Sequence, residues 1–268
     1  MRTFVISLQR SIERRKFIQQ QLDKLSLPFE FFDAVDGRAM TEQYIEENTN
    51  IVLVRQEINF LNRGAIGCAL SHYGIYKKMV EEGIEVALIM EDDVIISPSL
   101  KGILRRVKDT ITTEDLIMLY FQSKNPVEIT AQKAVDMSDG HKLQYMIKYG
   151  WVGAAGAYIL TKSVAQRMMQ IIHPIHTVAD SWTTFKQERA FNYFRCVLPF
   201  PVRPAGLKSE IDYLKEGSLY ARLANAIDKY KFPVLKQVLG AKRKRSLRKM
   251  QNYLLVDEDP FKTQIFSI

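Results

Sequence analysis

The chain has 268 residues, of which 47% are hydrophobic, and its formal net charge is +8. This ordinary globular composition is sufficient for a substantial core, either of one large α/β domain or of two smaller ones. No apolar run reaches the ~18 residues of a membrane-spanning helix, and the N-terminal apolar segment is too short for a secretory signal. The two cysteines, Cys68 and Cys196, fit no metal-binding spacing and are expected to be buried free thiols. We therefore expect a cytoplasmic or peripheral protein without disulfides.

Strands and helices are predicted to alternate through the first third of the chain. Apolar runs predict strands at residues 3–8, 29–35 and 86–90. Helices are predicted between these strands, from the N-cap Ser11 onward and at residues 41–48 and 62–79. This alternation is typical of a parallel sheet that binds a nucleotide at the carboxyl ends of its strands.

The second part of the chain is predicted to continue the same domain. We expect a helix at 97–108, a strand at 115–121, a loop or small hairpin at 122–145, a strand in the Gly- and Ala-rich segment 151–160, a helix at 161–172, a connection at 173–182, and a helix leading to 197–198. The sequence contains no internal repeat or low-complexity linker. These features favour a single domain over residues 1–225, followed by a basic amphipathic segment over residues 226–268.

Three consecutive carboxylates, Glu91, Asp92 and Asp93, follow the predicted strand at 86–90. If the strand continues, Glu91 and Asp93 face one side and Asp92 the other. Adjacent negative charges repel one another unless water, a cation or basic side chains offset them. A hard divalent ion such as Mn²⁺ or Mg²⁺, bound by carboxylate oxygens and by substrate phosphates, would do so. The alternative is a solvated turn before the next helix.

The excess positive charge lies in one segment near the C-terminus. Residues 229–249 contain nine basic and no acidic residues, and the rest of the chain has 29 basic and 30 acidic residues. Large apolar residues are interleaved with the lysines and arginines, which is typical of an amphipathic element on an anionic membrane surface. A solvated basic helix is the alternative, and nucleic-acid binding is disfavoured because no nucleic-acid motif accompanies the segment.

Four groups of residues form ordered motifs in the N-terminal part of the chain. They are Val5-Ile6-Ser7-Leu8 with Arg10-Ser11 and Arg14-Arg15, then Ala34-Val35-Asp36-Gly37, then Gly64 with Ile66-Gly67-Cys68 and Ser71-His72, and finally Glu91-Asp92-Asp93-Val94. In this order and spacing they resemble the motifs of glycosyltransferase family 25, the bacterial lipooligosaccharide transferases related to collagen galactosyltransferases. The resemblance covers about residues 3–210. Ala65 stands where many members of the family have an acidic residue.

The resemblance implies a GT-A fold, which is an α/β fold with a Rossmann-like, mostly parallel sheet flanked by helices. It also implies a UDP-sugar donor, usually UDP-galactose or UDP-glucose, transfer with inversion to a lipid-linked oligosaccharide at the inner membrane, and Mn²⁺ or Mg²⁺ bound by Asp93 and Glu91. The residues expected to contact the donor are Ser7, Leu8, Arg10, Arg14, Asp36, Gly37, Gly67, Ser71, Glu91 and Asp92.

For several of these residues, a purely structural role is the alternative to ligand binding. Arg10 and Arg14 are suited to bidentate contact with phosphate, but Arg14 is equally explained as an exposed helix charge. Asp36 would contact the nucleoside or simply form its turn. Trp151 and Trp182 are candidates for stacking on a sugar ring, with core packing as the alternative.

Inversion requires one general base that deprotonates the acceptor hydroxyl. Asp180, in the connection before Trp182, is our candidate. His72 is the rival, although a histidine on an early helical turn is often hydrogen-bonded within the core.

Two other classes of function fit parts of the sequence. A metal-dependent phosphotransfer enzyme would also place acids at a strand end, but the chain contains no Walker pattern. A non-enzymatic protein that binds membranes or nucleic acid would use only the basic segment. Release of UDP from UDP-sugars distinguishes these classes from a glycosyltransferase.

Overall fold

The computed structural model describes residues 1–56, 61–207, 250 and 252–263. The strands in these residues are β1 (Arg2–Ser7), β2 (Glu30–Asp33), β3 (Val86–Glu91), β4 (Val94–Ile96), β5 (Asp115–Met118), β6 (Val127–Thr130), β7 (Val135–Asp136), β8 (Lys142–Lys148), β9 (Ala157–Thr161), β10 (Tyr193–Leu198), β11 (Val202–Pro204) and β12 (Tyr253–Val256). The helices are α1 (Ile12–Lys24), α2 (Glu42–Asn48), α3 (Ile51–Gln56), α4 (Arg63–Glu81), α5 (Leu100–Thr110), α6 (Lys162–Ile172), α7 (Trp182–Gln187) and α10 (Pro260–Thr263).

Most of the strands form one large sheet. Its order is β12-β6-β8-β10-β5-β9-β3-β1-β2, with β7 paired to β8, while β4 and β11 form a separate antiparallel pair. The pairings place β1, β2, β3, β5, β6, β10 and β12 in one direction, and β8 and β9 in the other. The sheet is therefore mostly parallel, which confirms the predicted α/β fold class.

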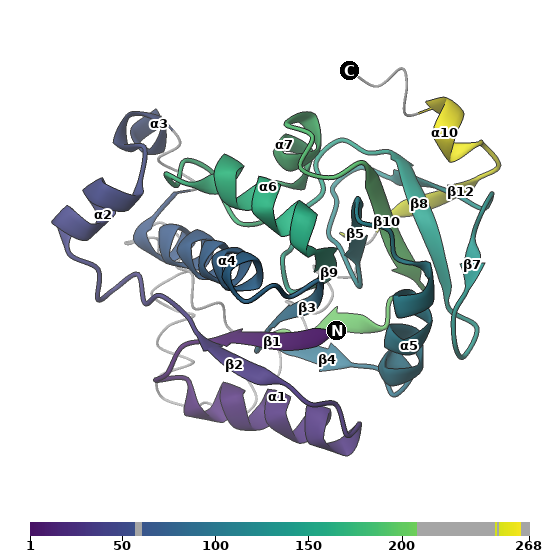
Figure 1. The fold of residues 1–268 in the computed structure, drawn as a ribbon, viewed down its shortest axis with the longest axis horizontal. Coiled ribbons are helices and arrows are strands. Elements are labelled where there is room, and N and C mark those ends of the chain that lie inside the picture. Colours follow the sequence, from purple (N-terminus) through teal and green to yellow (C-terminus); the bar gives the residue numbers. More distant parts are fainter. Residues whose placement is uncertain (57–60, 208–249, 251, 264–268) are drawn as a thin grey trace, which may run out of the picture.

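Helices cover both faces of this sheet (Figure 1). Along β1, Phe4 and Ile6 pack into the hydrophobic cluster that contains residues of α4 and α6. Val5 points to the opposite face and packs into the cluster that contains residues of α1 and α5. β3 alternates in the same way, because successive strand residues point to opposite faces. These buried strands place the C-terminal ends of β1 and β3 side by side, with Ile6 opposite Glu91.

The region at residues 122–145 differs from its prediction. It was expected to be a loop or small hairpin, but it contains β6, β7 and the start of β8, which is seven residues long. The polar residues of this region hid the apolar pattern by which strands are predicted. In the structure such residues find hydrogen-bond partners inside the fold: the Gln144 side chain is buried and donates to the carbonyl oxygen of Thr130 at 3.0 Å. In the segment 151–160, only the part from Ala157 onward is a strand.

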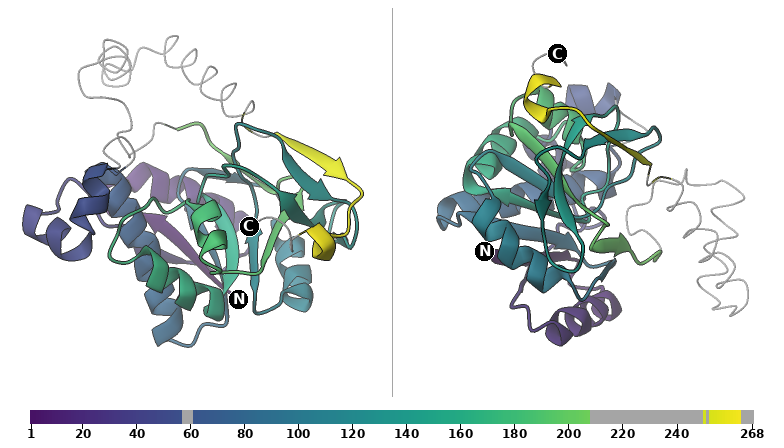
Figure 2. Two further views of the ribbon diagram at one scale, coloured as in Figure 1. Left: turned by 90° about the horizontal axis from the view of Figure 1, so that it is seen from above. Right: turned by 90° about the vertical axis from the view of Figure 1, so that its right-hand side faces the viewer.

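The end of the described chain returns to the sheet. β12 pairs in parallel with β6 at the edge of the sheet, where Figure 2 shows it in yellow beside the teal strands. Part of the segment predicted as a separate appendage, residues 226–268, therefore belongs to the sheet. The basic stretch at 229–249 lies outside the described residues. Within the described residues, no helix combines the length and the apolar character needed to cross a bilayer.

Candidate active site

The three acids lie at the C-terminal end of β3, and Asp92 points toward β1 and α1. Asp92 is only 5% exposed. One of its carboxylate oxygens accepts a hydrogen bond from Ser7 Oγ at 2.5 Å, and the other accepts one from Arg14 Nη1 at 3.0 Å. Arg14 Nη1 also lies 3.7 Å from Asp93 Oδ2. Ser7 and Arg14 thus hold Asp92 in place and bring a positive charge beside Asp93.

Glu91 and Asp93 are half-buried, and their surroundings raise the pKa of both carboxyl groups. Burial raises the pKa of Glu91 to about 7, with further contributions from the negative charges of Asp92 and Asp180. Burial and the charge of Glu91 raise the pKa of Asp93 to about 7, against the opposing effect of Arg14. The positive charge of Arg14 therefore does not compensate for the acids gathered at this strand end.

The loop at 153–156 connects the acidic strand end to Asp180. The backbone N–H of Glu91 donates to the carbonyl oxygen of Gly156 at 2.9 Å. At the other side of the loop, the N–H of Ala154 donates to Asp180 Oδ2 at 2.7 Å. Trp182 Nε1 donates to the carbonyl oxygen of Ala154 at 3.2 Å. These bonds fix Asp180 near the acidic strand end, where its charge affects Glu91.

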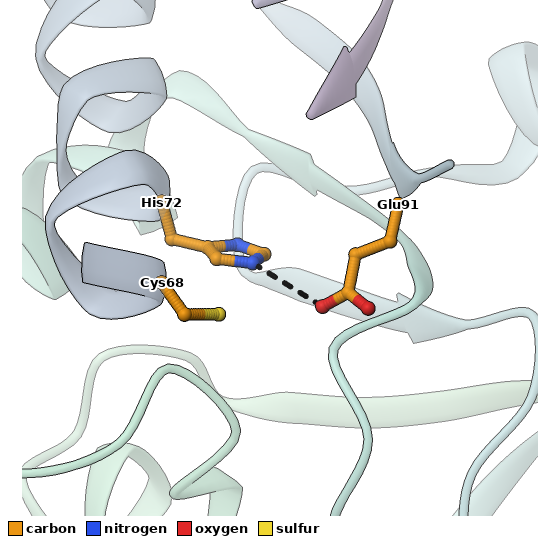
Figure 3. Close-up of side chains that lie close together, drawn as sticks. All are labelled: Cys68, His72 and Glu91. Carbon is orange, nitrogen blue, oxygen red and sulfur yellow. Dashed lines mark ion pairs between the residues drawn. The ribbon is translucent and has the colours of Figure 1, made fainter. Parts of the chain in front are cut away.

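Helix α4 contributes Cys68 and His72 to the same place (Figure 3). The two side chains lie one helical turn apart on the face that points toward Glu91. His72 Nε2 is 3.8 Å from Glu91 Oε1. One possible ligand atom from each of Cys68, His72 and Glu91 lies within 4.8 Å of the others. Both cysteines are free thiols, as predicted, but Cys68 is only half-buried.

His72 is fully buried and held by tyrosine hydroxyls. Its Nδ1 lies 2.7 Å from Tyr158 Oη, which lies 2.8 Å from Tyr76 Oη. Burial lowers the pKa of His72 to about 4, although the Asp180 carboxylate opposes this shift. With this pKa the His72 imidazole is neutral at pH 7, and its ring is enclosed in the core by the two tyrosines.

The residues expected to contact a nucleotide fall into two groups. Arg10 is exposed, and its Nε forms an ion pair with Asp36 Oδ2 at 2.6 Å. Leu8 is half-buried at the end of β1, where its carbonyl oxygen accepts a bond from Arg15 Nε at 3.2 Å. Leu8, Arg10 and Asp36 therefore lie near the C-terminal end of β1, the strand whose Ser7 bonds to Asp92.

Ser71, Gly67 and Gly37 have a supporting position instead. The hydroxyl of Ser71 is buried, accepts a bond from the N–H of Val35 at 2.9 Å and donates to the carbonyl oxygen of Gly67 at 2.6 Å. A Cβ on Gly67 would lie 2.6 Å from the carbonyl oxygen of Val35, and one on Gly37 would lie 2.2 Å from that of Arg63. These residues let the loop before Arg38 pack directly on α4, so we interpret them as supports of the site.

The two tryptophans differ in their exposure to solvent. Trp182 is fully buried in the core and packs edge-on against Tyr158, so it has no surface for a sugar. Trp151 is 47% exposed, at the start of the loop that leads to Gly153. Only Trp151 keeps the predicted possibility of stacking on a ligand.

Comparison with known proteins gives the family. Residues 1–183 match the model of "Glycosyltransferase family 25 (LPS biosynthesis protein)". The chain belongs to glycosyltransferase family 25. A "Putative glycosyltransferase" of Haemophilus influenzae is 30% identical over 183 residues, which are 66% of this chain and 61% of that protein. A "Glycosyltransferase 25 family member" of Anopheles gambiae is 30% identical over 175 residues, which are 62% of this chain and 28% of that protein.

Some relatives in the family are described as inactive. The "Probable inactive glycosyltransferase 25 family member 3" of Bos taurus is 28% identical over 174 residues, which are 62% of this chain and 28% of that protein. The matched part thus spans less than two thirds of each of these relatives.

The donor set of the site fits a divalent cation. Asp93 and Glu91 offer carboxylate oxygens, the ligands that Mn²⁺ and Mg²⁺ prefer, and the pKa of both carboxyl groups is raised by burial and by neighbouring negative charges. Sequence reasoning missed Cys68, Tyr158 and Tyr76 as members of this site. The spacing of Cys68 and His72, four residues apart on a predicted helix, was the available signal for Cys68.

The raised pKa values predict how the stability of the metal-free family 25 protein depends on pH. An unfolded chain releases the protons of Glu91 and Asp93 near pH 4, whereas the folded protein keeps them up to about pH 7. The contribution of these groups to stability therefore falls as the pH rises from about 4 to 7 and stays low above that. The midpoint of thermal unfolding, measured from about pH 5 to 8, should show this fall, and Mn²⁺ should raise the midpoint more at pH 8 than at pH 6.

The double variant Glu91→Gln, Asp93→Asn is the control for this prediction. It lacks both titrating groups, so its unfolding midpoint should change less over the same pH range and should not respond to Mn²⁺. An identical pH dependence in the variant and the unaltered protein would contradict the assignment of the raised pKa values to these two residues.

Proposed function

We propose that this chain is an inverting, metal-dependent glycosyltransferase that moves a hexose from a UDP-sugar to a lipooligosaccharide or lipopolysaccharide acceptor sugar and forms a β-linkage. The observation that carries the proposal is the grouping of three carboxylates: Glu91 and Asp93 lie at the acidic end of β3, and the loop at 153–156 holds Asp180 beside this end through bonds to Glu91 and Asp180. Glycosyl transfer needs two separate functions in one place, namely neutralisation of the leaving diphosphate and deprotonation of the acceptor. This group of carboxylates provides for both.

Each residue has a distinct part in the proposed reaction. A divalent ion held by Asp93 and Glu91 would stabilise the negative charge that develops on the leaving UDP. Arg14, held by Asp92, adds a guanidinium beside the same position and is suited to phosphate oxygens. The carboxylate of Asp180 takes the proton of the acceptor hydroxyl as this oxygen attacks the anomeric carbon.

We propose UDP-galactose as the donor, with UDP-glucose as the second choice. The description of the matching family, "LPS biosynthesis protein", supports a lipopolysaccharide or lipooligosaccharide acceptor. Such an acceptor is lipid-linked, so the proposed place of reaction is the cytoplasmic surface of the inner membrane.

Release of UDP tests the proposed reaction. The full chain is incubated with UDP-galactose or UDP-glucose and Mn²⁺, with and without acceptor oligosaccharide, and UDP is measured over time. We expect slow release without acceptor and faster release with it. A phosphotransfer enzyme would instead release or transfer a phosphoryl group, and a binding protein would do neither. Absence of UDP release from every UDP-sugar in the presence of acceptor would contradict the proposal.

The basic segment at 229–249 is proposed to hold the enzyme at an anionic membrane surface. Charge reversal at Lys242, Arg243, Lys244 and Arg245 should abolish sedimentation with anionic vesicles and leave transfer to a soluble acceptor unchanged, because each basic residue near such a surface contributes ~1 kcal/mol. Truncation before Lys229 is a poorer test, since it would also remove β12 from the sheet. Retained vesicle binding with lost transfer to the soluble acceptor would contradict this role.

A further inference from the structure

A buried nitrogen of the site has no hydrogen-bond partner. His72 Nε2 is buried, and no described residue forms a hydrogen bond with it. Buried polar atoms without a partner are rare in folded proteins because their loss of hydration is unfavourable. Figure 3 shows this nitrogen directed toward Glu91, with the thiol of Cys68 beside it. A cation bound between these three side chains would satisfy the nitrogen.

We propose that Cys68, His72 and Glu91 form a binding site for a divalent cation of the zinc class. Sulfur, imidazole nitrogen and carboxylate oxygen are the ligands that Zn²⁺ and Co²⁺ accept, whereas Mn²⁺ and Mg²⁺ prefer oxygen alone. The site is thus chemically different from the oxygen site at Asp93, although Glu91 belongs to both. This inference does not depend on the proposed transferase activity.

The distances are close to those of a tetrahedral zinc site. With Zn–S of about 2.3 Å and Zn–N and Zn–O of about 2.0–2.1 Å, the ligand atoms of such a site lie about 3.3–3.6 Å apart. His72 Nε2 and Glu91 Oε1 are 3.8 Å apart, and all three ligand atoms lie within 4.8 Å of one another. Side-chain movements of about 1 Å would complete the site. Cys68 and His72, four residues apart on α4, present their ligand atoms on one face of the helix.

The hydrogen bonds around His72 suit a metal ligand. Metal-binding histidines usually donate their second ring N–H to a neighbouring acceptor, which fixes the ring and leaves the other nitrogen free to bind. The Tyr158 hydroxyl, 2.7 Å from Nδ1, can accept such a bond in the tautomer that carries the proton on Nδ1, and it can donate in turn to Tyr76 Oη. A water would supply the fourth ligand, as it does in zinc sites with three protein ligands.

Metal binding by the full, metal-free chain tests the site directly. Equilibrium dialysis against Zn²⁺, with metal analysis of the protein, should give one tightly bound ion per chain. Cys68→Ser removes a direct ligand, so it should weaken this binding by more than the roughly 10–100-fold that loss of a ligand's hydrogen-bond partner costs. Co²⁺ should give a near-ultraviolet absorption band from sulfur-to-metal charge transfer that Cys68→Ser abolishes. Cys196→Ala, which removes the other cysteine, should keep both the affinity and the band.

A second measurement covers the case in which Cys68→Ser disturbs the fold. In the Cys196→Ala protein, Cys68 is the single thiol, and Zn²⁺ should slow its alkylation by iodoacetamide. Equal alkylation rates with and without Zn²⁺ would overturn the proposal. So would equal Zn²⁺ affinity in Cys68→Ser and in the unaltered protein, or a Co²⁺ complex without a sulfur band.

Discussion

Replacement of Asp93 by asparagine is expected to lower the rate of transfer by about 10²–10³-fold, the usual cost of removing one group that stabilises developing charge. The side chain of Asp93 is half-buried at the end of a strand and has no part in the apolar core. Asparagine keeps its size but removes a negative charge from the proposed metal site. Metal-dependent UDP binding should therefore be lost together with transfer, as measured by UDP release and by titration of UDP with and without Mn²⁺.

The fold should survive this change. Asp93 and Glu91 repel each other in the metal-free protein, so removal of one charge should leave the unfolding midpoint unchanged or raise it. Asp136→Asn is a matched control, because it removes a carboxylate whose side chain is 84% exposed on β7. Full transfer activity in Asp93→Asn, or an equal loss in Asp136→Asn, would contradict the assignment of Asp93.

The acidic strand end could be predicted because its signal is local. A continuous apolar run followed by three acids determines a buried strand and the place where it ends, and the structure has β3 at Val86–Glu91. The helix of His72 was likewise predicted, and in the structure Asn62 caps α4 by accepting from the N–H of Ala65 at 2.8 Å. Both elements follow from residues that are neighbours in the sequence.

Other features of the site depend on contacts between distant parts of the chain. Asp92 was predicted as a donor contact, but its partners Ser7 and Arg14 lie on β1 and α1, 85 and 78 residues away in the sequence. The alignment of β1 with β3 that brings them together is a product of tertiary packing, which no local pattern encodes. The orientation of Cys68 toward Glu91 has the same origin: its spacing from His72 indicates a shared helix face, but not that this face points to Glu91.

The position of Asp180 also depends on contacts that the sequence does not reveal. Its replacement is expected to have the second large effect on turnover. Its place in a connection before Trp182 suggested a functional residue, but only the structure reveals the loop that joins it to Glu91. Asp180→Asn should keep UDP-sugar binding and lower turnover by about 10²–10⁴-fold, since a general base contributes a factor of this size. Measurement of kcat separately from the affinity for the donor distinguishes these two effects.

Asparagine is the informative replacement at this position. It retains a side-chain oxygen that can accept from the N–H of Ala154, so the loop at 153–156 should keep its place, while the amide can no longer accept the proton of the acceptor hydroxyl. Donor affinity, measured by titration with a UDP-sugar and Mn²⁺, should therefore match that of the unaltered protein. Loss of this affinity would make Asp180 a donor or metal ligand. Retention of more than about a tenth of the turnover would exclude it as the base, because so small a loss is below the effect of a proton acceptor.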